Sequence, residues 1–199
     1  MRKELDDALV RKYPEIFRDR YGDARQTAMC WGFDCGDGWY NIIDSACAAI
    51  QSHVNNQHRH REFLIKWNEQ IQKAQAGDWS FLYDEWKSEQ ERAWLSVEEN
   101  LEKEKKKYLV ESREVPEPFP QPVATQVKEK YGTLRFYLSH EDEYVSGVVA
   151  MAEYMSGVIC ETCGAPGKTW GTGWVRTLCD QHAQEQGYAD TIEQPTGTS

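Results

Sequence analysis

Cys160-Glu-Thr-Cys163 is followed, after a Gly-rich loop, by Cys179-Asp-Gln-His182. Two residues separate the ligands of each pair, and this spacing lets a tight turn aim both side chains at one ion. Three thiolates and one imidazole fill all four positions of a tetrahedral site, which leaves no place for a reacting water molecule. The stretch therefore predicts one structural zinc ion per chain, held by a ribbon-like lobe over residues 159–190.

The loop between the two ligand pairs, residues 165–174, has too few aliphatic side chains to order itself. We expect the metal to supply the missing stabilisation of this lobe. Trp170 and Trp174 are expected in strands or a loop over the metal, where they are candidates for contact with a partner.

Composition narrows the classes of function. The 199-residue chain carries a formal net charge of −10. That charge disfavours non-specific binding to nucleic acid, which depends on Lys and Arg, and leaves an acidic surface for a basic protein partner. No apolar run approaches about 18 residues, so neither a membrane span nor a membrane partner is predicted. The first residues lack the apolar core of a signal peptide, and six cysteines without an export signal suit a reducing cytoplasm.

A second unusual stretch, Met29–Trp39, places three Gly and two Asp among large aromatic residues. Asp37 is well placed to cap a helix over residues 39–54. The simplest interpretation is a capped turn anchored by its aromatic side chains. The alternative is a surface for a ligand or partner, whose candidate residues are Trp31, Phe33, Asp37 and Trp39.

The other cysteines and most histidines suit structural roles better than a second metal site. Cys30 and Cys35 are five positions apart, which is a loose spacing for a metal, and Cys47 falls on the apolar face of the predicted helix. We therefore expect three buried, unreactive thiols. The segment with His53, His58 and His60 has no regular ligand spacing, and Asn55-Asn56 indicates a solvated junction between two helices.

Residues 55–122 are predicted to form an inserted helical hairpin with its return linker. Apolar stripes indicate one helix up to Gly77-Asp78 and a second one, with Trp86 in its stripe, that ends near Tyr108. Prolines at every second position of residues 116–122 predict an extended return segment. The hairpin either packs within the chain or meets a second copy, which would make a homodimer through residues 59–108.

The core is expected to combine residues 1–54 with residues 123–158. A helix over residues 3–13 comes first, alternating apolar positions predict a β-hairpin over residues 123–138, and a helix over residues 141–158 leads into the metal lobe. The fold class is therefore α+β, with a helical N-terminal part, an inserted long helical hairpin, a β-hairpin and a C-terminal zinc-ribbon-like lobe.

Lys128, Lys130 and Arg135 form a small basic group on the predicted β-hairpin of this acidic chain. The group could meet a phosphate or a carboxylate, although a solvated strand face is the simpler interpretation. At the end of the sequence, residues 191–199 are expected to form a disordered tail.

Three segments resemble a family of small tailed-phage and prophage proteins. They are Cys30–Tyr40 (CWGF-x-CGDGW), Val127–Tyr137 (VKEK-[YF]-G-x-LRFY) and the C-terminal CxxC...CxxH lobe. Thr133 departs from the pattern, in which a second Gly is usual. The family has no settled activity, so the resemblance implies only a phage setting, expression inside a bacterium and an accessory role.

Three classes of function follow. The first is a non-catalytic accessory protein of the host cytoplasm that binds a bacterial factor, such as a defence protein or its nucleotide signal. The second is a nucleic-acid-associated zinc module, which the acidic charge disfavours. The third is a hydrolytic enzyme that uses Asp34, Asp37 and Asp44, but no nucleophile–base pair or open metal site is evident. We favour the first class, with no catalytic residue assigned.

Overall fold

The computed structural model describes residues 1–85 and 88–188, without the side chain of Glu85. Helices predominate over two small sheets, and a Cys/His group lies near the carboxyl end, so the predicted α+β class with a zinc-type lobe is confirmed. The apolar contact predicted for Trp86 and the tail predicted at residues 191–199 fall outside the described residues. No helix in the described part of the chain is long and apolar enough to cross a membrane.

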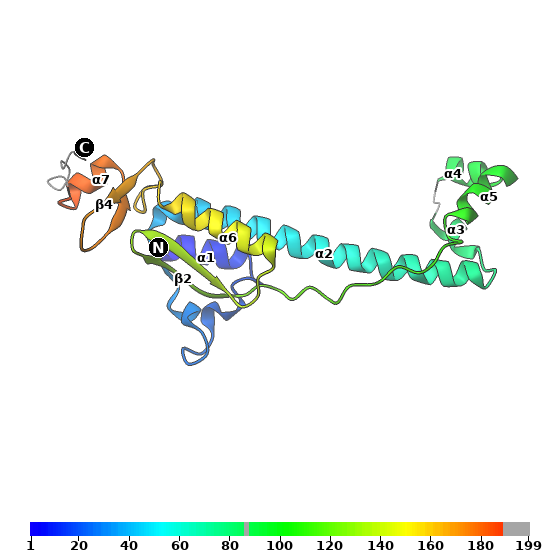
Figure 1. The fold of residues 1–199 in the computed structure, drawn as a ribbon, viewed down its shortest axis with the longest axis horizontal. Coiled ribbons are helices and arrows are strands. Elements are labelled where there is room, and N and C mark those ends of the chain that lie inside the picture. The colour runs from blue at the N-terminus through cyan, green and yellow to red at the C-terminus, as the bar shows by residue number, and fades with distance from the viewer. Residues whose placement is uncertain (86–87, 189–199) are drawn as a thin grey trace, which may run out of the picture. The chain divides into compact units, whose positions relative to one another are not determined.

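The chain forms two compact units, whose helices and strands can be followed in Figure 1. The first unit joins Met1–Val54 to the chain from Pro120 onward and contains both sheets. The second unit is Asn55–Phe119. Helix α2 (Tyr40–Gln75) contributes its start to the first unit and the remainder to the second. The Cys/His lobe belongs to the same unit as the α+β core.

The larger sheet has the strand order β1-β2-β3. Strands β2 (Ala124–Lys130) and β3 (Thr133–Leu138) form the predicted hairpin. Its turn consists of Tyr131 and Gly132, which have φ values of 55° and 79°, as a two-residue hairpin turn of type I′ requires. Strand β1 (Phe33–Asp34) pairs in parallel with β2, a contact that the sequence did not predict.

Helix α6 (Glu143–Ser156) covers the outer edge of β3. The backbone N–H of Leu134 donates to Ser156 Oγ at 2.8 Å, and that of Phe136 donates to Glu153 Oε1 at 3.0 Å. These side chains satisfy donors that an edge strand otherwise leaves open to a further strand. The sheet therefore ends at β3.

The core of the first unit lies between one face of the sheet and the helices α1 (Lys3–Lys12), α6 and the start of α2, which Figure 1 shows behind the hairpin. Its largest fully buried side chains are Leu9, Ile16, Phe17, Met29, Trp39, Ile43, Ile50, Leu134 and Phe136. Three short 3-10 helices, η1 (Arg18–Tyr21), η2 (Ala28–Trp31) and η3 (Asp37–Trp39), connect α1 to α2.

The predicted cap of α2 is corrected by the structure. Gly36 occupies the position before η3, and the Asp37 side chain makes no capping hydrogen bond. Asp37 instead accepts from the backbone N–H of Arg2 at 2.7 Å and pairs with its guanidinium at 2.9 Å. The carboxylate thus ties the start of the chain to the aromatic turn.

The helix break predicted at Asn55-Asn56 is wrong, because α2 continues through it. Asn costs a helix less than about 0.7 kcal/mol relative to Ala, which two residues cannot convert into a break. The side chains beyond this point also bind the returning chain. Asn68 and Arg113 exchange two hydrogen bonds of 2.7 and 2.8 Å, and His58 Nε2 lies 2.8 Å from the Phe119 carbonyl oxygen.

The second leg of the predicted hairpin is three short helices, α3 (Ser80–Glu85), α4 (Glu89–Leu95) and α5 (Glu98–Lys106). A capping box between Ser88 and Glu91 starts α4 and so divides the leg. The second unit has its own small core of Ala74, Phe81, Leu82 and Tyr108, with Trp67, Trp79 and Leu101 packed against it.

Asp142 caps α6 and holds α2 at the same time. Its carboxylate accepts from the Val145 N–H at 2.9 Å and lies 2.7 Å from His53 Nε2. Burial raises the pKa of Asp142, but the Val145 N–H and His53 outweigh burial and lower it. A lowered folded-state pKa adds stability above the unfolded pKa of about 3.9, and this stability is lost as pH falls through the folded value.

Asp142→Ala should therefore lower the free energy of unfolding by about 1–2 kcal/mol at neutral pH. The loss should begin to shrink as pH falls below about 4, and it should shrink further as pH falls through the lowered pKa of the folded state, where the wild-type carboxylate becomes protonated. Urea titrations of the wild type and of Asp142→Ala, at neutral pH and at a pH well below 4, measure the difference in the free energy of unfolding. An equal loss at both would show that the carboxylate charge has no part in it.

Candidate metal centre

The two ligand pairs come from different local structures. Cys160 and Cys163 lie on a tight turn in which the Gly164 N–H donates to the Cys160 carbonyl at 2.8 Å, and Gly164 has a φ of 79° that favours glycine. Cys179 follows strand β5 (Arg176–Leu178), which pairs with β4 (Lys168–Trp170). His182 lies in the first turn of α7 (Asp180–Glu185).

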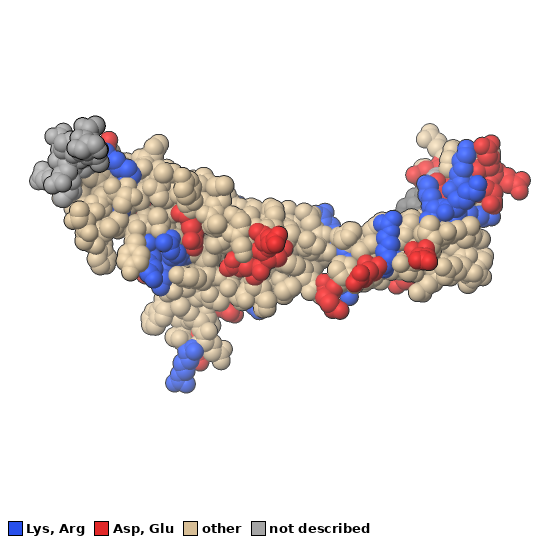
Figure 2. Space-filling model, in the orientation of Figure 1, with Lys and Arg blue, Asp and Glu red and all other residues tan. Residues whose placement is uncertain are grey.

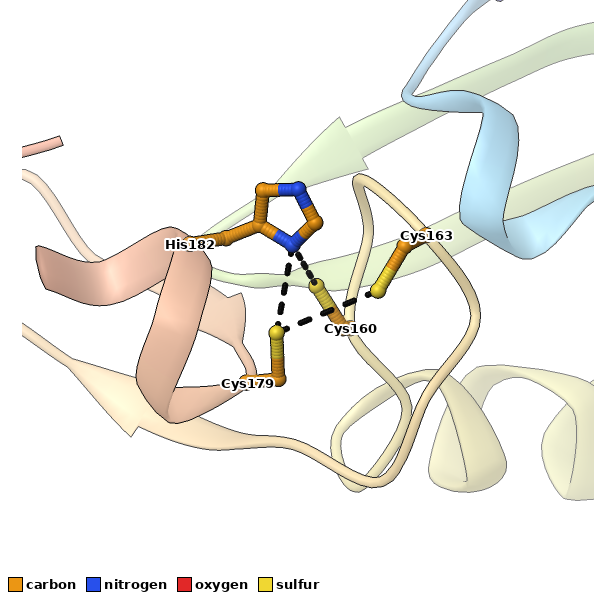
Figure 3. A group of neighbouring side chains, drawn as sticks. All are labelled: Cys160, Cys163, Cys179 and His182. Atoms are coloured by element: carbon orange, nitrogen blue, oxygen red, sulfur yellow. Dashed lines mark hydrogen bonds between the residues drawn. The ribbon is translucent and has the colours of Figure 1, made fainter. Parts of the chain in front are cut away.

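The four donor atoms converge, as Figure 3 shows. His182 Nδ1 lies 3.1 Å from Cys179 Sγ and 3.6 Å from Cys160 Sγ, and the sulfurs of Cys163 and Cys179 are 3.9 Å apart. All four atoms lie within 4.8 Å of one another. A tetrahedral ion with sulfur bonds of about 2.3 Å holds its sulfur ligands about 3.8 Å apart. The donor set therefore fits such an ion.

No protein-family model, curated protein or solved structure matches this chain. The resemblance to phage proteins thus stays a prediction.

The protonation of the thiols suits metal binding. Burial raises the pKa of Cys160, but the backbone N–H groups of Cys179, Cys163 and Thr162 outweigh it and lower that pKa to about 6. For Cys163, the Ala165 N–H lowers the pKa, whereas burial and the neighbouring thiols outweigh it and raise the pKa. A bound cation removes such a remaining proton, because coordination favours the thiolate.

A carboxylate lies near the far side of the imidazole. His182 presents Nδ1 to the sulfurs, while its Nε2 lies 3.8 Å from a carboxylate oxygen of Glu185, one turn further along α7. This separation is longer than a hydrogen bond, so the carboxylate is a neighbour of the ring and does not fix its orientation. Glu185 thus lies next to the donor group, and the CxxC and CxxH spacings did not point to it.

The lobe is attached to the aromatic turn by close backbone contacts. The Gly38 N–H donates to the Glu161 carbonyl at 2.8 Å, the Gly36 N–H donates to Glu161 Oε1 at 2.9 Å, and the Trp39 indole donates to the Ile159 carbonyl at 2.8 Å. The other carboxylate oxygen of Glu161 pairs with Arg176 at 2.8 Å. The glycines are needed here, because a Cβ on Gly38 would lie 2.2 Å from the Cys160 carbonyl oxygen.

The aromatic candidates for partner binding divide into buried and exposed residues. Phe33, Trp39 and Trp170 are buried in the core or the lobe, so they stabilise the fold and offer no surface to a partner. The Trp170 indole donates to the Leu178 carbonyl at 2.9 Å. Trp31 and Trp174 are exposed, at 79% and 76% of their surface.

The three basic candidates lie together on the hairpin. Lys128 and Arg135 are cross-strand partners on the face of the sheet that points away from Leu134 and Phe136, and Lys130 comes next on that face. Figure 2 shows blue surface over the hairpin. Arg135 has a carboxylate neighbour, Glu153, at 3.7 Å. Among the described residues, Lys128 and Lys130 have no carboxylate partner.

Two exposed tyrosines beside these cations were missed by the sequence reasoning. Lys128 Nζ lies 5.9 Å from the Tyr137 ring centre, and Lys130 Nζ lies 5.4 Å from that of Tyr131. The period of two along a strand was the available signal for Tyr137, because it places Tyr137 on the same face as Arg135. The carbonyl of Gly132, beside Tyr131, accepts from Thr177 Oγ1 at 2.6 Å, so the hairpin turn abuts the lobe.

The remaining groups have structural contacts. All six cysteines are free thiols. Cys35 and Cys47 are buried, and burial raises the pKa of Cys35 to about 12 and that of Cys47 well above its ordinary value. Asp44 binds the Lys12 ammonium at 2.7 Å and the Tyr13 hydroxyl at 2.9 Å, which engages one of the carboxylates that a hydrolase would need.

Proposed function

We propose that this chain is a non-catalytic phage accessory protein that acts in the bacterial cytoplasm by binding a host factor, with one zinc ion per chain as a structural staple. The observation that carries the proposal is the convergence of three sulfurs and one imidazole nitrogen within 4.8 Å. Zinc is the metal that best matches such a ligand set. Four protein ligands leave no open position, so the ion stabilises the lobe and recognition falls to other surfaces.

The surface that suits recognition is the basic hairpin face, Lys128 and Lys130, with the adjacent Tyr131 and Tyr137. Unpaired ammonium groups attract phosphate or carboxylate, and exposed aromatic rings supply stacking area. This pairing fits a nucleotide signal of a host defence system, or an acidic segment of a defence protein. Trp174, on the neighbouring lobe, extends the aromatic surface.

Nucleic acid is the second candidate, and the same residues favour it, because single strands are bound by cations that follow the backbone and by rings that stack on bases. The overall charge of −10 opposes it. Binding to a single-stranded DNA oligonucleotide that weakens steeply as salt rises would favour this candidate over a nucleotide signal.

Lys128→Glu combined with Lys130→Glu should weaken the binding of a phosphate-bearing ligand about tenfold or more, or about 1.4 kcal/mol. The reason is that two carboxylates, which repel phosphate, replace two ammonium groups. The probes are mononucleotides, cyclic dinucleotides and a single-stranded DNA oligonucleotide, measured by calorimetry after native mass spectrometry of the bacterially expressed protein has shown any retained nucleotide.

Lys73→Glu combined with Lys106→Glu is the matched control, because both lysines are exposed and lie in the other unit. This control variant changes the net charge by the same amount as the Lys128 and Lys130 variant, and it should leave the affinity for the nucleotide probes unchanged. Equal loss in both double variants would assign the effect to net charge alone. Unchanged binding in the Lys128 and Lys130 variant would remove the hairpin face from the proposal.

A further inference from the structure

The first unit contains an open apolar groove between α2 and α6, with a volume of about 680 Å³. Its lining residues are mostly apolar or small, and they include Ala46, Ala49, Tyr144, Gly147, Val148, Met151, Ala152 and Met155. Glu143, at the start of α6, is the charged residue among them. In Figure 2 the surface over α6 is largely uncharged, with acidic residues near its beginning.

The exposed side of α6 carries large apolar side chains along one stripe. Tyr144, Met151, Tyr154 and Met155 are exposed to 49%, 59%, 76% and 41%, and Val158, just after the helix, is exposed to 54%. Spacings of three and four residues place these side chains in line along the helix. A contiguous stripe of this kind is typical of an interaction surface.

Gly147 leaves a gap in this stripe of side chains, because glycine has no side chain. It lies in the interior of α6, where glycine is unfavourable, and a Cβ built on it would meet no atom within 4 Å. Ala46, Ala49 and Ala152 also line the groove and are small. Packing within the chain therefore does not require glycine here, whereas a side chain that enters from outside would.

The stripe is complementary to itself. If two copies of α6 pack antiparallel about a two-fold axis at Met151, then Met155 of one copy faces Gly147 of the other, Tyr154 faces Val148, and Val158 faces Tyr144. A long, flexible Met side chain thus meets the gap left by Gly147. Met151 meets its own counterpart, as a two-fold interface requires.

Charge agrees with this arrangement. A chain with a net charge of −10 repels its own copy except where its surface is uncharged. Glu143 lies at the end of the stripe, so the two-fold axis at Met151 places the two Glu143 residues at opposite ends of the pair. Neither carboxylate then faces its counterpart.

We propose that the α2–α6 groove is a homodimer interface, in which α6 of a second copy packs antiparallel across Met151. This site is distinct from the basic hairpin face and from residues 59–108, and it does not depend on the function proposed above.

Cysteine cross-linking at the axis tests the geometry. Met151→Cys should give a disulfide-linked dimer on mild oxidation of the intact, metal-loaded protein, because the two sulfurs face each other. Ala150→Cys is the matched control, since Ala150 is also exposed but points about 100° around the helix. Comparable cross-linking of both, or of neither, would overturn the proposal.

A second variant tests the gap. Gly147→Gln should shift the protein to monomer in sedimentation velocity runs over a range of concentrations, because the side chain occupies the space that Met155 of the other copy needs. It should also raise the melting temperature of the monomer, since Gln is a better helix former. Ala150→Gln should leave the dimer intact. A wild-type protein that stays monomeric at every concentration, or a Gly147→Gln protein that still dimerises, would overturn the proposal.

Discussion

Cys163→Ser should abolish zinc binding at the proposed site and unfold the lobe that contains β4, β5 and α7. The lobe has a core of only Cys160, Trp170, Leu178 and Ala183, with Cys179 and Tyr188 packed against it. So few apolar side chains do not stabilise an independent structure. The binding free energy of structural zinc in small domains, about 10–16 kcal/mol, is largely folding free energy. Loss of one ligand therefore removes most of what holds the lobe.

Metal content by native mass spectrometry and near-UV circular dichroism measure this effect, since Trp170 is buried only while the lobe is folded. Cys30→Ser is the matched control, because Cys30 lies outside the donor group, and it should keep one ion per chain. A chelator that removes all metal but leaves the near-UV spectrum unchanged would contradict the structural role of the ion.

Gly38→Ala should be strongly destabilising, although it adds only a methyl group. Its Cβ would lie 2.2 Å from the Cys160 carbonyl oxygen, 2.4 Å from the Gly164 nitrogen and 2.8 Å from the Cys163 nitrogen. All three are backbone atoms, so no side chain can rotate away. We expect a loss of about 3 kcal/mol or more in the free energy of unfolding, together with weaker metal binding, because the ligand turn must shift.

Gly173→Ala provides the control for this substitution. Gly173 belongs to the lobe, but a Cβ there meets nothing within 4 Å. Its stability and its metal affinity should remain within about 0.5 kcal/mol of wild type, the usual range for surface changes. If chemical denaturation of Gly38→Ala and Gly173→Ala gave the same midpoint, the close contact between turn and lobe would not exist in solution.

The clustering of the four Cys and His side chains was predictable, because the sequence signal for it is local. Cys160, Cys163, Cys179 and His182 follow two short spacings, and the chemistry of thiolate and imidazole restricts what such spacings can mean. The β-hairpin was equally local, since alternating residues and a two-residue turn define it. Glu161, by contrast, was not predictable, because nothing near it in the sequence indicates that its carboxylate meets the Gly36 N–H.

The errors in the fold arose where distant segments decide the structure. The polar composition around Asn55-Asn56 indicated a junction between two helices, whereas α2 is continuous there. Side chains further along α2 bind the returning chain, as Asn68 does with Arg113, and these contacts cannot be inferred from local composition. Trp39 and Phe33 were candidates for a recognition surface only as the alternative to a turn anchored by its aromatic side chains. Their burial depends on the sheet and the lobe, which come from the other end of the sequence.

The contacts of Gly36 with Glu161 and of Trp39 with Ile159 span 125 and 120 positions. At about 5–20 residues per second, a ribosome needs about 6–24 s to make the chain between the two partners. During that interval the nascent chain carries an unpaired indole and open amide groups. Because His182 is translated after Cys160, Cys163 and Cys179, the proposed site would capture an ion only late in synthesis, and we expect a product that stops short of His182 to be prone to proteolysis.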